Sequence, residues 1–228
     1  RRKIACMKVF YNYLKYQNII EENPFNQLRF QFRTEKVLPK TIPYNILKSI
    51  FIYLEQKVIV SKTDYQKQHA ERNLLIISLL LSTGIRISEL CHIHLKDINL
   101  SNKTLQIIGK GKKERILFLG DQKTFNLLET YINKTRNESN DFLFPGKHSL
   151  KPLSEQSVRL VIKRIVEQNN FSRTITPHMF RHSFATMLLD SDVDIRYIQQ
   201  ILGHSSISIT QIYTHVSHSK QKEILSSF

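Results

Sequence analysis

The longest apolar run of this 228-residue chain is the stretch 74–81, which reads LLIISLLL. It is too short to cross a bilayer, because a membrane-spanning helix needs about 20 apolar residues. The pattern predicts a helix from about Gln68 to Thr83 that carries this run, and Gly84 ends it. With 41% hydrophobic and 23% charged residues, the composition is that of an ordinary globular protein. We therefore expect a soluble chain of one large domain or slightly more.

The remaining pattern predicts a mainly α chain with a small antiparallel β-hairpin sheet. Segments 104–108 (TLQII) and 115–119 (RILFL) are rich in β-forming residues and flank the basic sequence GKGK, as in a hairpin with a basic tip. Further helices are expected at about 4–17, 41–58, 122–134, 154–168, 176–189 and 194–202, followed by a last segment from 205 or 206 to Tyr213.

The first helix stands apart from the others in the sequence. A single amphipathic helix cannot bury its own apolar face. We therefore interpret residues 1–30 as the C-terminal remnant of an N-terminal helical domain. The stretch 31–40 (QFRTEKVLPK) is polar, basic and punctuated by proline, which is typical of a linker. The main domain is expected to span 41–228.

The charge balance favours an anionic partner. The chain holds 34 Lys and Arg against 19 Asp and Glu, so its net charge is +15. Nucleic acid is favoured over a membrane, because a membrane binder usually gathers its basic residues on one helix or tail. A basic surface that only aids solubility remains an alternative. The two cysteines, Cys6 and Cys91, are too few for a disulfide framework or a Cys-based zinc site, which agrees with a cytoplasmic location.

Two segments resemble metal-binding motifs but lack a residue that each motif requires. The segment 190–194 imitates the first half of a calcium loop, but Ile195 occupies the position that requires glycine. His178 and His182 are spaced as in a zinc protease, but Met179 follows His178 in place of the glutamate base. No carboxylates converge as two-metal phosphoryl transfer requires. We expect neither a metal nor another cofactor.

Metal-free attack on a phosphodiester needs fixed cations, and the planar guanidinium group binds phosphate oxygens in pairs. Arg86 follows the helix-ending Gly84 and opens a short helix, with Glu89 three residues on and able to orient it. Arg181 shares a helix face with His178, three residues earlier. Either arginine alone would more often be a solvated surface residue.

Five motifs occur together in one order, and in this order they closely resemble the tyrosine recombinases, which include the bacterial Xer proteins and many phage and mobile-element integrases. The motifs are TGIRISEL, the basic hairpin, HMFRHSFAT, LGHS and IYTH. The resemblance covers about residue 41 to the C-terminus and implies the tyrosine recombinase catalytic domain fold. The opening NYLKYQNIIEENPF resembles the end of the family's N-terminal core-binding domain.

The resemblance implies a role for each matching position. Arg86 and Arg181 would bind the scissile phosphate, with His178 and His204 beside it, and Tyr213 would be the nucleophile.

Lys110 would be the general acid, although Lys112 and Lys113 lie in the same loop and stay as alternatives. Glu89 would support the pocket. His182 is interpreted as a supporting or packing residue.

The implied function is site-specific recombination or integration of double-stranded DNA through a 3′-phosphotyrosyl intermediate, without metal or ATP. The implied assembly is a tetramer on paired DNA sites, with the segment 214–228 docking on a neighbouring protomer or, alternatively, on its own domain. Two rival functions are DNA relaxation, as by a type IB topoisomerase, and DNA-binding regulation without catalysis.

Overall fold

The computed structural model describes residues 2–28, 40–109, 114–135, 141–146 and 151–203. The chain divides into two compact units, residues 1–37 and 38–228, and each is described by itself. The segment expected from 205 or 206 to Tyr213 lies outside the described residues.

The first unit contains helix α1 (Arg2–Tyr16) and a short 3-10 helix (Pro24–Asn26). Asn23 joins them, because its side-chain amide donates hydrogen bonds to the Lys8 carbonyl at 3.2 Å and to the Asn12 side chain at 2.6 Å. Much of the apolar surface of α1 stays exposed, at Met7, Val9, Phe10, Tyr13 and Tyr16.

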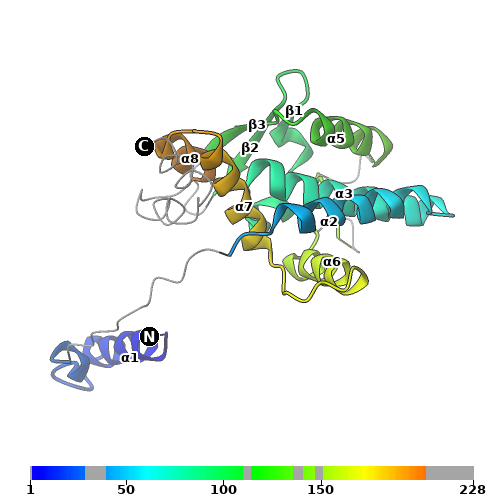
Figure 1. Ribbon diagram of the computed structural model, residues 1–228. Coiled ribbons are helices and arrows are strands. Elements are labelled where there is room, and N and C mark those ends of the chain that lie inside the picture. Colours follow the sequence, from blue (N-terminus) through cyan, green and yellow to red (C-terminus); the bar gives the residue numbers. More distant parts are fainter. Residues whose placement is uncertain (1, 29–39, 110–113, 136–140, 147–150, 204–228) are drawn as a thin grey trace, which may run out of the picture. The chain divides into compact units, whose positions relative to one another are not determined.

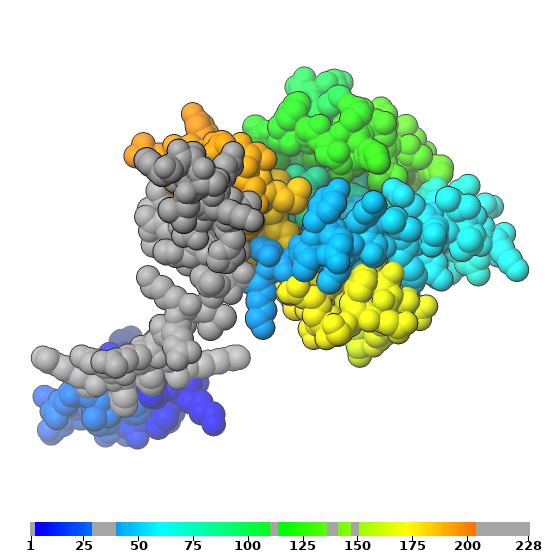
Figure 2. Space-filling model, viewed as in Figure 1, coloured from blue at the N-terminus to red at the C-terminus, as the bar shows by residue number. Residues whose placement is uncertain are grey.

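The second unit is mainly helical with one small antiparallel sheet, which confirms the predicted fold class. Figure 1 shows α3 at the centre, with α5 and α6 on opposite sides of it. In Figure 2, α2 and the beginning of α3 cross the visible face between α5 and α6. The helices are α2 (Tyr44–Ile59), α3 (Asp64–Thr83), α4 (Ile87–Cys91), α5 (Gln122–Thr135), α6 (Glu155–Gln168), α7 (Pro177–Asp190) and α8 (Ile195–Leu202).

Helix α3 forms the middle of the core. It begins four residues earlier than predicted, because the Thr63 side chain accepts a hydrogen bond from the Gln66 amide at 3.2 Å and so caps the helix. Residues 74–80 are all buried, as expected for an apolar helix surrounded by others. The helix ends at Gly84, whose φ of 61° lies in the left-handed region that glycine adopts without strain.

The sheet contains β1 (Ile98–Asn99), β2 (Thr104–Ile108) and β3 (Glu114–Phe118) in that order, all antiparallel. The pair Leu105 and Leu117 is buried on the inner face. The hairpin matches the prediction to within a residue. The sequence pattern does not predict β1, because a two-residue strand shows no alternation.

Helices α7 and α8 pack on each other through a small second core built on Ala185, Ile198 and Leu202. The Asp194 side chain caps α8 by accepting a hydrogen bond from the Arg196 amide at 2.7 Å, and Gly203 ends the helix with φ 63°. Within the described ranges no cluster of His, Cys, Asp and Glu could hold a metal ion. Nor does any helix described there have the length and apolarity needed to cross a membrane.

Candidate functional site

Arg86 lies between the end of α3 and the start of α4, and Glu89 fixes it at two points. The Arg86 backbone amide donates to Glu89 Oε2 at 2.8 Å, and Arg86 Nη1 donates to Glu89 Oε1 at 2.9 Å. The Glu89 side chain is only 5% exposed, whereas that of Arg86 is 37% exposed. One edge of the Arg86 guanidinium is thus held by protein while part of the group faces solvent.

A second arginine binds the same carboxylate, and the sequence reasoning missed it. Arg115 Nη1 and Nη2 donate to Glu89 Oε1 and Oε2 at 3.0 and 2.8 Å. Burial alone raises the pKa of Glu89, but the hydrogen bonds from Arg115 and Arg86 lower it to about 2. Arg115 stands two residues before the buried Leu117 on β3. Arg115 therefore lies on the inward-facing side of the strand. A cation at such a position was the signal by which the sequence could have identified it.

Arg181 is buried on α7, with 5% of its surface exposed. Its Nη1 donates to the Gly84 carbonyl at 2.7 Å, and its Nη2 donates to the Leu202 carbonyl at 2.5 Å. Arg181 therefore ties the end of α3 to the end of α8.

The end of α8 brings the three arginines together. Its last carbonyls carry the negative end of the helix dipole, which attracts cations. Arg115 Nε donates to the Ile201 carbonyl at 3.0 Å, and Arg86 Nη2 donates to the Gly203 carbonyl at 3.3 Å. Arg181 binds the Leu202 carbonyl between them, so three consecutive carbonyls bind arginines from three separate parts of the chain.

Helix α7, which carries Arg181, also carries the two candidate histidines. His178 is exposed, His182 is half-buried, and both line a cavity of about 320 Å³. Burial lowers the pKa of His182 to about 4, and the charges of His178 and Arg181 add to this effect. His182 is therefore neutral at pH 7. The other lining residues are Lys40, Thr174, Thr176 and Met179.

Three of the expected site residues, Lys110, His204 and Tyr213, lie outside the described residues, as do Lys112 and Lys113. The residues that flank the lysine stretch and the residue before His204 are described. The 110–113 stretch joins β2 to β3, and His204 directly follows Gly203, whose carbonyl binds Arg86. The structure thus brings together Arg86, Glu89 and Arg181 and leaves the other three positions untested.

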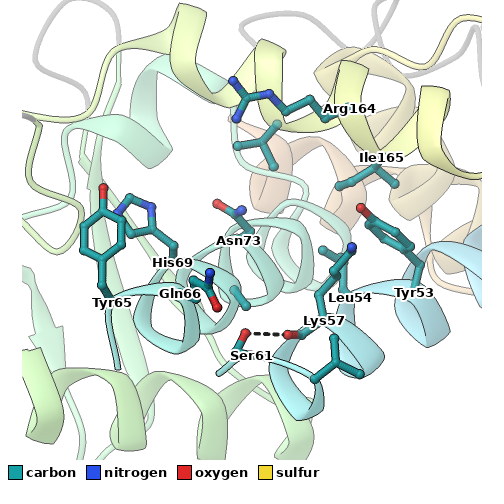
Figure 3. A pocket seen from close by; sticks show the side chains of 13 residues that line it. Tyr53, Leu54, Lys57, Ser61, Tyr65, Gln66, His69, Asn73, Arg164 and Ile165 are labelled. Atoms are coloured by element: carbon teal, nitrogen blue, oxygen red, sulfur yellow. Dashed lines mark hydrogen bonds between the residues drawn. The ribbon is translucent and has the colours of Figure 1, made fainter. Parts of the chain in front are cut away.

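A larger cavity of about 430 Å³ lies between α2, the first half of α3 and α6 (Figure 3). Tyr65 and His69 lie together on one side of it, and Tyr53 and Lys57 on another. Its lining residues on α3 end at Asn73, ten residues before the end of that helix. At 1.5 Å per residue this separates the cavity from the arginine cluster by roughly 15 Å, so the two sites are distinct.

Comparison with known proteins gives one consistent family. Residues 53–220 match the Phage integrase family. A tyrosine recombinase of Agathobacter rectalis is 52% identical over 228 residues, which cover 99% of this chain and 74% of that protein. The tyrosine recombinase XerC of Bacillus subtilis is 35% identical over 223 residues, covering 95% of this chain and 69% of its own length.

Solved structures agree with the sequence matches. The XerH site-specific recombinase bound to palindromic difH substrate, in a post-cleavage complex, superposes with a TM-score of 0.72 at 25% identity, covering 95% of this chain and 63% of that one. The XerA recombinase gives a TM-score of 0.68 at 26% identity, covering 98% of this chain and 73% of that one.

Proposed function

The chain belongs to the phage integrase family of tyrosine recombinases, and from this we propose that it cleaves and rejoins double-stranded DNA at specific sites. The observation that best supports the proposal is the meeting of Arg86, Glu89 and Arg181 at the end of α8. Arg86 and Glu89 come from one motif and Arg181 from another, and a phosphodiester cleavage site without a metal needs fixed cations such as these two arginines.

In the proposed reaction the Tyr213 hydroxyl oxygen attacks the scissile phosphorus. A bond forms between that oxygen and phosphorus while the tyrosine proton is lost to solvent. The bond from phosphorus to the 5′ oxygen breaks, and this oxygen takes up one proton and leaves as a hydroxyl. Deprotonating tyrosine at pH 7 costs about 4 kcal/mol, since its ordinary pKa is near 10. Positive charge from Arg86 and Arg181 offsets this cost. The phosphotyrosyl ester conserves the bond energy, so rejoining needs no ATP.

The leaving 5′ oxygen needs a general acid, because an alkoxide is a poor leaving group. We propose that Lys110, in the connection of the hairpin, donates a proton to this oxygen. Lys112 and Lys113 in the same loop are alternatives. We propose that His178 and His204 lie beside the scissile phosphate. His182, which is neutral at pH 7, is proposed to be a supporting or packing residue.

The proposed partner is double-stranded DNA, which suits the net charge of +15. Xer-type relatives are bacterial, and the cytoplasm is the proposed place of action. We assign residues 41–228 to the catalytic domain, 31–40 to a linker and 1–30 to the C-terminal part of a helical core-binding domain.

We also propose that four protomers assemble on two paired sites, with the segment 214–228 docking on a neighbour. Deleting residues 222–228 should leave single-site binding intact but weaken paired-site complexes in gel-shift assays. A deletion that chiefly unfolds the monomer would instead place the segment on its own domain.

The function is tested by trapping the covalent intermediate. Nicked candidate sites are incubated with the protein, and denaturing gels reveal any protein–DNA adduct. Tyr213→Phe should abolish the adduct while DNA binding persists, because only one hydroxyl is lost. Wild-type protein that binds DNA without an adduct would indicate a regulator, and supercoil relaxation without exchange between two marked sites would indicate a topoisomerase.

A further inference from the structure

Arg115 makes more contacts at the site than its place on a β-strand would suggest. It binds both oxygens of the Glu89 carboxylate and also the Ile201 carbonyl at the end of α8. Given the function proposed above, we propose that Arg115 is a positioning residue for DNA cleavage: it offsets the charge of Glu89, so that Arg86 keeps its positive charge for the scissile phosphate, and it fastens the hairpin to the end of α8.

Exposure separates the roles of the two arginines. The Arg115 side chain is 13% exposed and that of Arg86 is 37% exposed, although both bind a carboxylate that is only 5% exposed. Arg86 is therefore the member of the pair that DNA can reach. Arg115 lies behind the carboxylate and acts on the phosphate through Glu89 and Arg86.

The charge balance of the cluster depends on Arg115. Glu89 is ionised at neutral pH, so Arg86 and Glu89 together carry no net charge. Adding Arg115 gives the three groups a net charge of +1. In a site that excludes water, one unit of charge facing a phosphate matters strongly, because the local dielectric is low.

Arg115 also connects the hairpin to the arginine cluster. It is the second residue of β3, and Glu114 before it pairs with Ile108 of β2 across the mouth of the 109–113 connection. This connection carries all three candidate general acids. Arg115 also contacts Gly203 closely, since a Cβ built there would lie 3.1 Å from Arg115 Nη1. A single side chain, just after the end of the 109–113 connection, thus reaches the residue before His204.

The test measures cleavage of two nicked DNA sites of the same sequence. One has a normal scissile phosphate, and the other has a neutral methylphosphonate in its place. Arg115→Met should slow single-turnover cleavage of the normal phosphate by about 100-fold, as loss of a preorganised charge at such a site does. Affinity for uncleaved DNA should change little. With methylphosphonate the slowing should be much smaller, because there is less charge to stabilise. A merely structural defect would slow both substrates equally.

A charge-restoring double variant sharpens the test. Arg115→Met with Glu89→Gln leaves Arg86 as the only charge and returns the cluster to +1, so it should cleave the normal phosphate faster than Arg115→Met alone. Arg115→Lys keeps the positive charge. Its ratio of cleavage rates, normal phosphate to methylphosphonate, should therefore stay near that of the parent. Arg115→Gln replaces Arg115→Met if the latter fails to fold, as judged by circular dichroism.

The matched control is Lys134→Met, which removes a cation from the partly buried Glu71 between α5 and α3. It should leave the cleavage rate nearly unchanged. The inference is wrong if the neutral Arg115 variants cleave like the parent, if they slow both substrates equally, or if adding Glu89→Gln restores no cleavage of the normal phosphate. A parent protein that forms no covalent adduct at all would instead overturn the proposed function.

Discussion

Arg181 and Gly84 stand 97 residues apart in the chain, and Arg181 Nη1 donates a 2.7 Å hydrogen bond to the Gly84 carbonyl. The second nitrogen of the same guanidinium binds the Leu202 carbonyl. One buried side chain thereby sets the spacing between the ends of α3 and α8. Arg86 lies only two residues after Gly84 in the chain.

Arg181→Lys should impair cleavage strongly. A lysine ammonium is a point charge without the planar fork, so it cannot reproduce both carbonyl contacts and present a planar face to the phosphate. We expect a cleavage rate lower by at least about 100-fold, with binding to uncleaved DNA largely kept. Single-turnover cleavage of nicked DNA measures the effect. Arg164→Lys on α6 is the control, and an Arg181→Lys rate equal to the parent's would refute the need for the fork.

Gly84→Ala should destabilise the second unit. The residue has φ 61°, and an added Cβ would clash with the Phe184 ring and lie 2.9 Å from Leu202 Cδ2. Left-handed strain and overpacking each cost about 1–2 kcal/mol or more, so we expect a loss of at least about 2 kcal/mol in unfolding free energy. Urea denaturation provides the measurement. Gly120→Ala is the control, because its added Cβ would meet nothing closer than 3.6 Å.

Glu89 should contribute a distinct acid-dependent part of the stability. Its pKa falls from an ordinary 4.5 to about 2 in the folded protein, so its contribution is complete above about pH 4.5 and disappears as the pH falls through 2. The full shift corresponds to about 3 kcal/mol. Between pH 7 and pH 3 the parent should therefore lose about 2 kcal/mol more unfolding free energy than Glu89→Gln. Parallel urea titrations giving equal losses would contradict this assignment.

DNA binding should weaken steeply with salt. Each phosphate contact displaces condensed counterions, so the logarithm of the binding constant falls with the logarithm of salt with a slope of about −0.9 per contact. A net charge of +15 favours several contacts. Fluorescence anisotropy with a short duplex at several salt concentrations gives the slope, and a slope near zero would contradict DNA as the partner.

The sequence predicts most of the fold because its helices carry strong local signals. Gly84, Asp194 and Gly203 end or begin helices where expected, and the hairpin lies where two β-rich segments flank a basic turn. The start of α3 was missed by four residues, since the capping by Thr63 precedes a polar first turn without apolar periodicity. Strand β1 exists only because β2 pairs with it.

The candidate site was predicted less completely than the fold. Motif spacing indicates Arg86, Glu89 and Arg181, and the structure brings these three together. Arg115 was missed because its importance comes from a contact with Glu89, 26 residues earlier, and from the end of α8, which is 86 residues later. Only the packing of the sheet against α4 and α8 creates those contacts. The catalytic roles of all these residues remain predictions, and Lys110, His204 and Tyr213 also lie outside the described residues.

The three arginine contacts at Ile201, Leu202 and Gly203 also limit how this part of the chain can vary in length. Successive carbonyls along a helix are turned by about 100°, because one turn holds 3.6 residues. Inserting or deleting one residue within α8 would rotate all three carbonyls away from their arginines at once. Exposed side chains such as Tyr197 can be exchanged freely by comparison. We therefore expect α8 to tolerate substitutions but not changes in residue number.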